Sequence, residues 1–596
     1  MEPSQFYQNR LKELQAQLKK LQQRKSSFAW LRLGAIIAIP AVFYLLFSLG
    51  FIYVAITTII LLYIFIRLIY ADLNNQSKIE HTNQLIRINE DELKCLAGNY
   101  YDFNDGSEHI PKDHLYANDL DIFGRASLFQ YINRTGSEPG SKQLADYLKY
   151  PSSLQLILAK QIAIKELSAK TLWIQDLQSF GKKNKITFST KNRLEDWIQE
   201  SPVFSHFKPW KWLRYVLPFI ILTIVTLYIF DVAGNTVFYL SLFIFAAIAY
   251  QVNKVIAPVH EKLSKIANEL STLSESLAHI EKEHFESPFL KELQAIFIET
   301  NKKASEDIYG LKKILDKLDL RYNLVISAPL NILLLWNLQQ VLDLEKWKSK
   351  QQHHINLWFD TLGHFEALSS LAILYFNQPG WVFPSVVAGY FYIEGQEIGH
   401  PLIPENKRVD NFIHISNNTE LMLVTGSNMA GKSTYLRSIG VNIVLAMTGS
   451  PVCATLFKVS PVQLMSSMRI ADNLEESTST FYAELKKLKT IIEKVNAEEK
   501  VFILLDEILR GTNSLDRHTG SKALIRQLIK HKAAAIIATH DLELADLKNQ
   551  YPENILNYHF DVQVSHDELY FDYRLKPGIC TSLNASILMK KIGIEL

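Results

Sequence analysis

The chain has 596 residues, enough for several domains, and its net charge of +2 gives no global electrostatic argument for nucleic-acid binding. Any contact with DNA would have to come from local basic patches. The three cysteines, Cys95, Cys453 and Cys580, are widely separated and form no metal-ligand spacing. They predict free, buried thiols in a reducing compartment.

The N-terminal 70 residues combine a polar helix with a long apolar block. Residues 1–28 carry leucines at helical spacing, which predicts an amphipathic helix. No charged residue lies between Arg32 and Arg67, too long a stretch for one untilted helix because about 20 residues span a bilayer. With a turn at Ser48-Leu49-Gly50, we expect transmembrane helices at about residues 29–48 and 51–70. A buried core hairpin is the alternative, although uniform apolarity is unusual in soluble helices.

A second apolar block follows a polar linker (residues 71–112) and a first helical segment (residues 113–211). It runs from Tyr215 to Asn253, and its only charge is Asp231 in a turn-like sequence. The pattern predicts a second transmembrane hairpin over residues 212–253, with helices at about 212–230 and 236–253.

In each hairpin, basic residues precede the first helix and follow the second helix. Neither connecting turn contains Lys or Arg. The flanking residues are Lys19, Lys20, Arg24, Lys25, Arg32, Arg67, Lys78, Lys208, Lys211, Arg214 and Lys254. The positive-inside rule then puts both termini in the cytoplasm. We therefore expect a multi-pass protein of the cytoplasmic membrane, with the lipid bilayer as a partner.

The remaining chain divides into a helical and an alternating part. Residues 254–376 predict helices, with an apolar stripe at Leu263, Ile266, Leu270, Leu273 and Leu277 that fits either a long lever helix or a plain bundle. Residues 377–596 alternate apolar strands with helices, which predicts an α/β sheet.

A phosphate-binding loop opens the strongest motif of the chain. Residues 425–434 read T-G-S-N-M-A-G-K-S-T, with an apolar strand pattern before them and a helix pattern after them. In such a loop the backbone amides cradle a phosphate, Lys432 reaches the β- and γ-phosphates, and the Ser433 hydroxyl binds Mg²⁺. The pattern predicts ATP and Mg²⁺ as ligands; a glycine-rich structural turn is the alternative.

Two more apolar runs end in chemically useful residues. Residues 501–505 read V-F-I-L-L, typical of a strand buried on both faces, and end in Asp506 and Glu507. One carboxylate can hold the Mg²⁺ shell and the next can polarise water toward the γ-phosphate. The run at residues 533–538 leads to His540, which we expect at the same sheet edge as a γ-phosphate sensor.

In this order the motifs resemble those of the MutS family of DNA mismatch-repair ATPases. The loop is close to the family's T-G-P-N-M-G-G-K-S-T, and D-E-I-L-R-G-T-N-S at residues 506–514 is similar to D-E-I-G-R-G-T-S-T. Ser479-Thr480-Phe481 followed by Glu484 resembles the S-T-F-x-x-E signature. Arg134-Thr135 and Gly140-Ser141 are similar to the start of the family's helical core. The resemblance implies an α/β P-loop ATPase domain joined to an all-α core and lever, here with two transmembrane helical hairpins.

The resemblance also implies site residues and a homodimer, in which Ser479 of one subunit completes the nucleotide site of the other. Glu507 and His540 would be catalytic, and Ser433 and Asp506 would bind Mg²⁺. The residues expected to bind nucleotide are Asn411, Gly426, Ser427, Asn428, Met429, Ala430, Gly431, Lys432, Ser433, Thr434 and Ser479. Asn411 stands where family members carry an asparagine near the base.

Three functions compete at this point. The first is a membrane-anchored MutS-like ATPase that lacks the mismatch-reading domain and binds mismatched or branched DNA; its candidate contacts are Lys142, Lys182, Lys183 and Lys185, which as a charge run also fit a solvated surface. The second is a mechanical ATPase that acts on membrane or protein partners without DNA. The third, an ABC-type transporter, is disfavoured because the L-S-G-G-Q signature is missing and four crossings make a poor substrate pathway.

Overall fold

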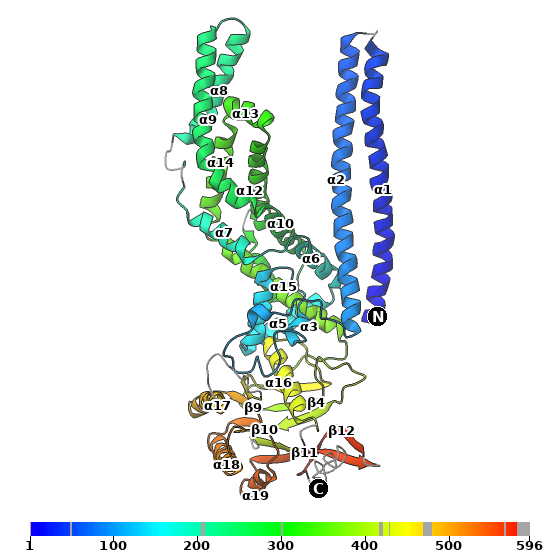
Figure 1. Ribbon diagram of the computed structural model, residues 1–596, viewed down its shortest axis with the longest axis vertical. Helices are drawn as coiled ribbons and strands as arrows, with labels where there is room; N and C mark the ends of the chain where they lie inside the picture. The colour runs from blue at the N-terminus through cyan, green and yellow to red at the C-terminus, as the bar shows by residue number, and fades with distance from the viewer. Residues whose placement is uncertain are drawn as a thin grey trace.

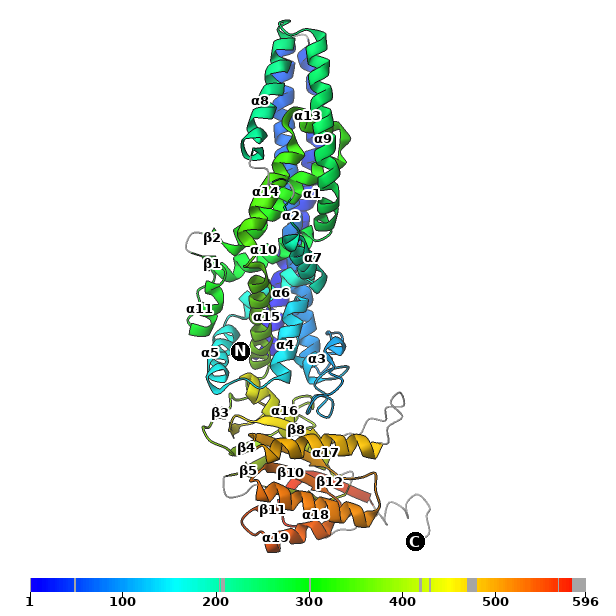
Figure 2. The same ribbon diagram turned by 90° about the vertical axis from the view of Figure 1, so that its left-hand side faces the viewer.

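The computed structural model describes residues 2–47, 50–202, 204, 209–299, 302–416, 421–427, 430–468, 480–565 and 568–580. The molecule is elongated (Figures 1 and 2). Two long helical hairpins point toward one end, a helical body lies in the middle, and an α/β domain occupies the other end. The predicted combination of a helical N-terminal region with an α/β C-terminal region is therefore present.

The first hairpin consists of α1 (Pro3–Leu46) and α2 (Phe51–Leu96), which lie antiparallel. The amphipathic segment and the apolar segment of α1 form one helix rather than two. The expected linker at residues 71–112 is also wrong in its first part, because α2 continues to Leu96. The physical reason is a small apolar cluster in which Leu14 of α1 packs against Leu85 and Ile88 of α2.

The second hairpin consists of α8 (Trp210–Ile229) and α9 (Asn235–Ser264), joined by the predicted turn, where Asp231 has a φ of 57°. By length and composition, four helices of the described chain could cross a membrane: α1, α2, α8 and α9. The apolar stretches of α1, α2 and α8 are only 6% buried. Ser48 and Leu49 of the other expected turn lie outside the described residues.

The body is built from helices on both sides of the second hairpin in the sequence. They are α3 (Leu128–Ile132), α4 (Glu138–Lys149), α5 (Leu154–Ser168), α6 (Thr171–Lys183), α7 (Phe188–Gln199), α10 (Ala267–Lys282), α11 (Pro288–Ala295), α12 (Ala304–Asp319), α13 (Leu324–Leu334), α14 (Trp336–Gln351) and α15 (Ile355–Asn377). A two-stranded sheet of β1 (Ile298–Glu299) and β2 (Lys302–Lys303) lies between α11 and α12. The stripe expected on one long helix is buried as predicted, but it is shared by α9 and α10, which are separate helices.

The α/β domain has a six-stranded sheet in the order β12-β11-β6-β10-β9-β8, in which β12 alone runs antiparallel to its neighbour. A four-stranded sheet in the order β3-β7-β4-β5 adjoins it. The strands are β3 (Ser385–Val386), β4 (Ile393–Ile398), β5 (Asn411–Ile415), β6 (Leu421–Thr425), β7 (Leu456–Val459), β8 (Gln463–Ser467), β9 (Val501–Asp506), β10 (Ala534–Thr539), β11 (Ile555–Ser565) and β12 (Glu568–Pro577).

Helices cover both faces of the larger sheet. α16 (Lys432–Thr448) packs on the face that carries Met422 and Leu504, whereas α17 (Thr480–Asn496) and α18 (Ser514–Lys530) pack on the face that carries Leu423 and Leu505. Neighbouring residues of one strand point to opposite faces, so strands covered on both sides need continuous apolar runs. This explains why the apolar runs at residues 421–424, 501–505 and 533–538 form β6, β9 and β10. A short η4 (Leu542–Asp546) and α19 (Leu547–Gln550) follow β10.

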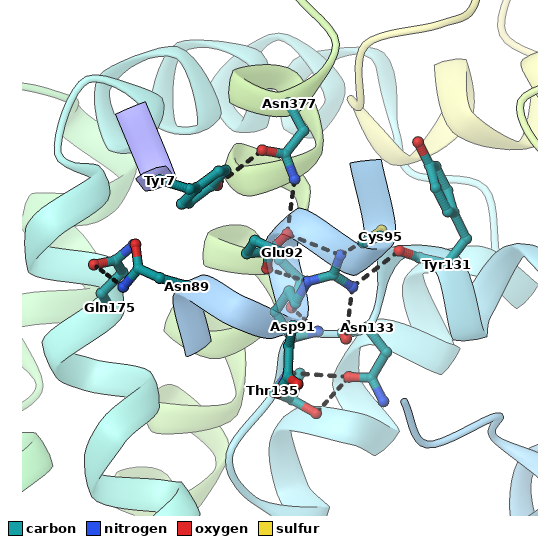
Figure 3. A network of polar contacts seen from close by, with 12 residues as sticks. Tyr7, Asn89, Asp91, Glu92, Cys95, Tyr131, Asn133, Thr135, Gln175 and Asn377 are labelled. Carbon is teal, nitrogen blue, oxygen red and sulfur yellow. Dashed lines mark hydrogen bonds and ion pairs between the residues drawn. The ribbon is translucent and has the colours of Figure 1, made fainter. Parts of the chain in front are cut away.

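A buried polar network attaches the first hairpin to the body (Figure 3). Glu92 of α2 accepts hydrogen bonds from Arg134, with Nε–Oε1 at 2.5 Å and Nη2–Oε2 at 3.1 Å. Asn377 at the end of α15 donates to Glu92 at 2.8 Å and accepts from the Tyr7 hydroxyl of α1, also at 2.8 Å. Both helices of the hairpin are thus bound to the same point of the body, far from the hairpin tip.

Candidate nucleotide site

The phosphate-binding loop connects β6 to α16 and contains two glycines in the left-handed region. Gly426 has a φ of 144°, and a Cβ there would lie 2.8 Å from the Phe560 carbonyl oxygen. Gly431, with a φ of 103°, is the residue that caps the start of α16. Both positions require the conformational freedom of glycine, and the helix start they create leaves amide groups available to an anion.

Lys432 is the first residue of α16 and is buried. Its Nζ donates to the carbonyl oxygens of Gly426 at 2.8 Å and Ser427 at 3.0 Å, so the side chain is folded back under the loop. Burial lowers the pKa of Lys432 to about 8, against the opposing effect of the nearby Asp506 and Glu507 carboxylates. The ammonium group therefore lies beneath the position where loop amides would hold phosphates.

Ser433 and Asp506 form a pair suited to a divalent cation. The Ser433 hydroxyl donates to Asp506 Oδ2 at 2.5 Å, while Asp506 Oδ1 is buried without a hydrogen-bond partner. A buried carboxylate oxygen without a partner is unfavourable unless a cation or another donor satisfies it. Hydroxyl and carboxylate oxygens are the ligands that Mg²⁺ prefers, so these two residues fit the predicted Mg²⁺ site.

Glu507 lies next to this pair and is held by two cationic or polar groups. Its Oε1 is 2.7 Å from His540 Nε2, and its Oε2 is 2.8 Å from Arg510 Nε. The hydrogen bond from His540 and the charge of Arg510 lower the pKa of Glu507 despite its partial burial. His540 Nε2 also lies 3.1 Å from Lys432 Nζ. We assign the ring proton to Nε2, donating to Glu507, because the contact with the carboxylate is shorter.

The sheet register explains why residues 100 positions apart meet. β10 lies between β6 and β9, with Thr539 beside Thr425 and Ala538 beside Asp506. The carboxyl ends of all three strands therefore lie at one edge. The structure brings together there the five residues expected to act on the phosphates: Lys432, Ser433, Asp506, Glu507 and His540.

Other predicted residues have different placements. Both polar ends of the Asn411 side chain bind the backbone of β12, donating to the Tyr573 carbonyl oxygen at 3.0 Å and accepting from the Leu575 amide at 2.8 Å. Its contact with a base remains a prediction. Ala430 is buried and Thr434 is exposed. Asn428, Met429 and Ser479 lie outside the described residues.

Glu484 is a positioning residue whose role the sequence did not reveal. From α17, its Oε1 accepts a hydrogen bond from the Leu509 amide at 2.5 Å. Phe481 of the same helix packs against Gly511, where an added Cβ would lie 2.6 Å from the Phe481 Cβ. These two contacts fix the segment that follows Glu507. The signature S-T-F-x-x-E thus supports the Asp506–Glu507 segment of its own chain.

A cavity of about 590 Å³ opens beside Glu507 and His540. Its other walls come from the start of α18 and from η4, including Leu515 and Leu542. Leu515 is 74% exposed although it is apolar. His518 and Asp541 also line the cavity, and His518 Nδ1 lies within hydrogen-bond distance of Asp541 Oδ2, at 2.7 Å.

The site is connected to the helical body by three consecutive residues. Asp119 accepts hydrogen bonds from the Ser466 hydroxyl of β8 at 2.7 Å and from Lys487 of α17 at 2.5 Å. Leu120 packs against Gly440 of α16 so closely that an added Cβ would lie 2.8 Å from it. Asp121 is 3.2 Å from Arg437 of α16. A movement of α16 or α17 would therefore be transmitted to the body through these contacts.

Two of the basic residues considered for DNA contact have acidic partners in the chain. Lys182 is bound to Asp91 of α2 at 2.6 Å, and Lys183 lies 3.7 Å from Glu80 of the same helix. Lys142 is exposed on α4. Lys182 and Lys183 thus tie α6 to the first hairpin, a role that neither DNA contact nor the alternative of a solvated surface run had anticipated.

Nucleotide binding at pH 8 is expected to take up protons. A pKa of about 8 leaves Lys432 about half protonated at that pH, and a neighbouring triphosphate would raise the pKa. Calorimetry with Mg²⁺ and a non-hydrolysable ATP analogue, in buffers of different ionisation enthalpy, should give an uptake of up to about half a proton per site at pH 8, falling toward zero at pH 6.5. A buffer-independent enthalpy at pH 8, or an uptake that grows toward pH 6.5, would contradict this role of Lys432.

Comparison with known proteins shows what this domain is similar to. Residues 422–590 match a protein-family model described as MutS domain V. The DNA mismatch repair proteins MutS of Persephonella marina and Aquifex pyrophilus are 33% and 34% identical over 238 and 221 residues, and the human MutS protein homolog 4 is 32% identical over 205 residues. The alignments cover 39%, 36% and 33% of this chain.

The same alignments cover only 27%, 25% and 22% of the relatives, so the chain spans about a quarter of their length. The matched residues 422–590 include Lys432, Asp506, Glu507 and His540. These four residues are among the five that meet at one edge of the sheet. Residues 422–590 are therefore similar to MutS domain V, and the relatives that they match are MutS proteins and a MutS homolog.

Proposed function

We propose that this chain is a membrane-anchored, MutS-like ATPase that hydrolyses ATP with Mg²⁺ and acts on DNA through nucleotide-driven closure of a homodimer. The observation that supports it most strongly is the meeting of Lys432, the Ser433–Asp506 pair and the Glu507–His540 pair at one sheet edge. A structural glycine-rich turn would not need a buried lysine, an acidic pair and a histidine around it.

Each residue has a defined task in this proposal. Lys432 would neutralise charge on the β- and γ-phosphates, and Ser433 and Asp506 would hold the Mg²⁺ that bridges them. Glu507, kept as a carboxylate by His540 and Arg510, would orient and deprotonate the attacking water. His540 would couple the binding of the γ-phosphate to the position of Glu507, because it contacts both Glu507 and Lys432.

Dimerisation is proposed because the site opens on one side into a cavity with an exposed apolar border. The cavity beside Glu507 is bordered by the exposed apolar Leu515, which a second copy of the domain would cover. In that arrangement Ser479 of the partner subunit would approach the γ-phosphate with its hydroxyl.

Membrane anchoring is proposed from the two hairpins. Their apolar residues are solvent-facing in the monomer, as with Tyr44 and Phe51 in the first hairpin and Phe243 in the second. Both hairpins extend away from the α/β domain toward the same end of the molecule (Figure 1). Because basic residues lie at their bases, this orientation would put the ATPase domain and both termini in the cytoplasm.

The mechanical ATPase without DNA stays a second candidate because specific contacts favour it. Lys182 and Lys183 bind acidic residues of α2, and the Glu92–Arg134 pair joins the same helix to the body. Nucleotide-driven movement of the body would therefore be delivered to a membrane hairpin even in the absence of DNA.

Binding of mismatched, nicked and branched duplexes to the full chain in lipid nanodiscs separates the two candidates. The DNA-binding function predicts affinity that falls steeply with salt, by about 10³–10⁵-fold between 50 and 200 mM for six to ten phosphate contacts. ATP hydrolysis measured on the same sample shows that the protein is intact. An active ATPase that ignores every duplex at 50 mM salt would exclude the DNA function and leave the mechanical one.

A further inference from the structure

A third segment of the chain has the composition of a membrane element. No Asp, Glu, Lys or Arg occurs between Arg321 and Asp343. The structure folds this stretch into α13, a break at Leu335 and the start of α14, and the two helices meet at an angle of 75°. With 11 residues, α13 is too short to cross a bilayer.

The fold places α13 against the second hairpin, at the tip of a helical excursion from the body. α12 leads from the body to α13, and α14 returns (Figure 1). α13 contacts both α8 and α9. Its Ile332 and Leu333 pack against the apolar cluster that contains Ile221 of α8 and Phe245 of α9. Those two residues lie well inside the segments proposed to span the membrane.

Polar contacts at the end of the second hairpin nearest the body mark where its apolar segments begin. Arg214, at the start of α8, binds Gln339 at 2.7 Å and Asp343 at 2.9 Å, both on α14. Asn253 of α9 accepts from Asn337 at 3.3 Å. α14 thus crosses the polar boundary of the hairpin between its first turn and Asp343, and α13 lies on the apolar side of that boundary.

Backbone groups at the break between α13 and α14 have hydrogen-bond partners within the chain, as a position within a membrane requires. At the break, where Leu335 has a φ of 47°, its amide donates to the Asn331 carbonyl oxygen at 3.1 Å. The Asn331 side chain accepts from the Asn337 amide at 2.9 Å and donates to the Ser327 carbonyl oxygen at 2.8 Å. The Asn331 side chain therefore serves the backbone of the break.

The outer side of α13 is apolar and uncovered by the described part of the chain. Val325 is 84% exposed and Ile326 is 44% exposed, and Ala328 and Pro329 are also exposed. A surface for another protein would be expected to carry a polar rim. The exposed residues named here carry no charge, and α13 itself packs against both helices of the second hairpin.

We propose that α12, α13 and the start of α14 form a re-entrant hairpin whose tip, α13, is embedded in the cytoplasmic leaflet of the bilayer. Val325, Ile326 and Pro329 would contact lipid acyl chains. This inference rests on the membrane anchoring proposed above. It gives the body a third attachment to the membrane, and the chain continues from α14 directly into α15, which reaches toward the ATPase domain (Figure 2).

Nitroxide labels on single cysteines test the proposal in the full chain, reconstituted in vesicles of phosphatidylethanolamine and phosphatidylglycerol. The test site is Val325→Cys. Phe243→Cys on α9 is the reference for the second hairpin, and Tyr309→Cys, exposed on α12, is the aqueous reference. The three native cysteines are buried, and the wild-type chain labelled in parallel measures their background.

The label at position 325 is expected to collide with dissolved oxygen in preference to an aqueous nickel chelate. The label at 243 should show the same preference, and the label at 309 should show the opposite one. A chelate-accessible label at 325 together with a lipid-facing label at 243 would overturn the re-entrant hairpin while leaving the anchoring intact. A chelate-accessible label at 243 would overturn both. Spin–spin broadening at 325 that is lost on dilution with unlabelled chain would assign the surface to a second copy instead.

Discussion

The Glu507→Gln variant is expected to hydrolyse ATP about 10²–10⁴-fold more slowly than the wild-type chain while binding ATP with similar affinity. Glutamine keeps the shape of the side chain and can still accept the hydrogen bond that His540 Nε2 donates to Oε1. It cannot take a proton from water. Because Lys432 and the Ser433–Asp506 pair are unchanged, the phosphates would still be held. Phosphate release and the Kd for ATP, measured with Mg²⁺, give the two quantities.

The matched control for this variant is Glu493→Gln, which makes the same chemical change on α17. Glu493 is exposed and forms an ion pair with Lys489 at 3.7 Å, a surface pair of small energetic value. Hydrolysis and binding are both expected to stay at wild-type values. If Glu507→Gln turned over ATP as fast as this control, Glu507 would not be the general base and another group would have to activate water.

The phosphate edge of the site could be predicted because its signals are local. A strand, a glycine-rich turn and a helix start are adjacent in residues 421–435, and the turn conformation follows from Gly426 and Gly431. The positions of Asp506 and His540 followed from one rule, that parallel strands end at the same edge. That rule needs the existence of the sheet but not its strand order.

Other parts of the site depend on tertiary contacts that no local pattern encodes. Asp119 reaches β8 and α17 across more than 340 positions of sequence, and Glu484 serves the backbone of a segment 25 positions away. The neighbours of Asp119 do not distinguish it from a solvated acid, and the signature that contains Glu484 does not say which backbone amide it binds. Their partners become known only when the body and the α/β domain are packed together.

Three features of the helical region differ from the sequence analysis. In the first two, packing against other helices decides where a helix begins and ends, whatever the polarity of the segment. Residues 72–96 are polar yet helical because α2 packs on α1 and α6, and the stripe on α9 and α10 is buried although the helix is interrupted. α13 escaped the sequence analysis since it is half the length of a membrane span and contains Pro329 and Asn331. The missing charges between Arg321 and Asp343 were the available signal.

Replacing Arg134 with Met is expected to weaken the attachment of the first hairpin to the body by about 3–5 kcal/mol, the usual cost of leaving one partner of a buried ion pair alone. All five N–H donors of Arg134 have acceptors: Glu92 takes two, the carbonyl oxygens of Tyr131 and Asn133 take two, and Cys95 Sγ takes one. The variant would leave the Glu92 carboxylate, which is 2% exposed, with the amide of Asn377 as its remaining donor among these groups.

Hydrogen exchange of α2 between Ile79 and Cys95 measures this loss, because local opening exposes those amides. The double variant Glu92→Met with Arg134→Met is the matched control: it removes both charges, and its exchange should return toward that of the wild-type chain. The nucleotide site lies in another domain, so the Kd for ATP should stay the same in both variants. Unchanged protection of α2 in Arg134→Met would mean that the small apolar cluster of Leu14, Leu85 and Ile88 holds the hairpin without the ion pair. In that case a nucleotide-driven movement of the body would reach the membrane through α13 and the second hairpin rather than through the first.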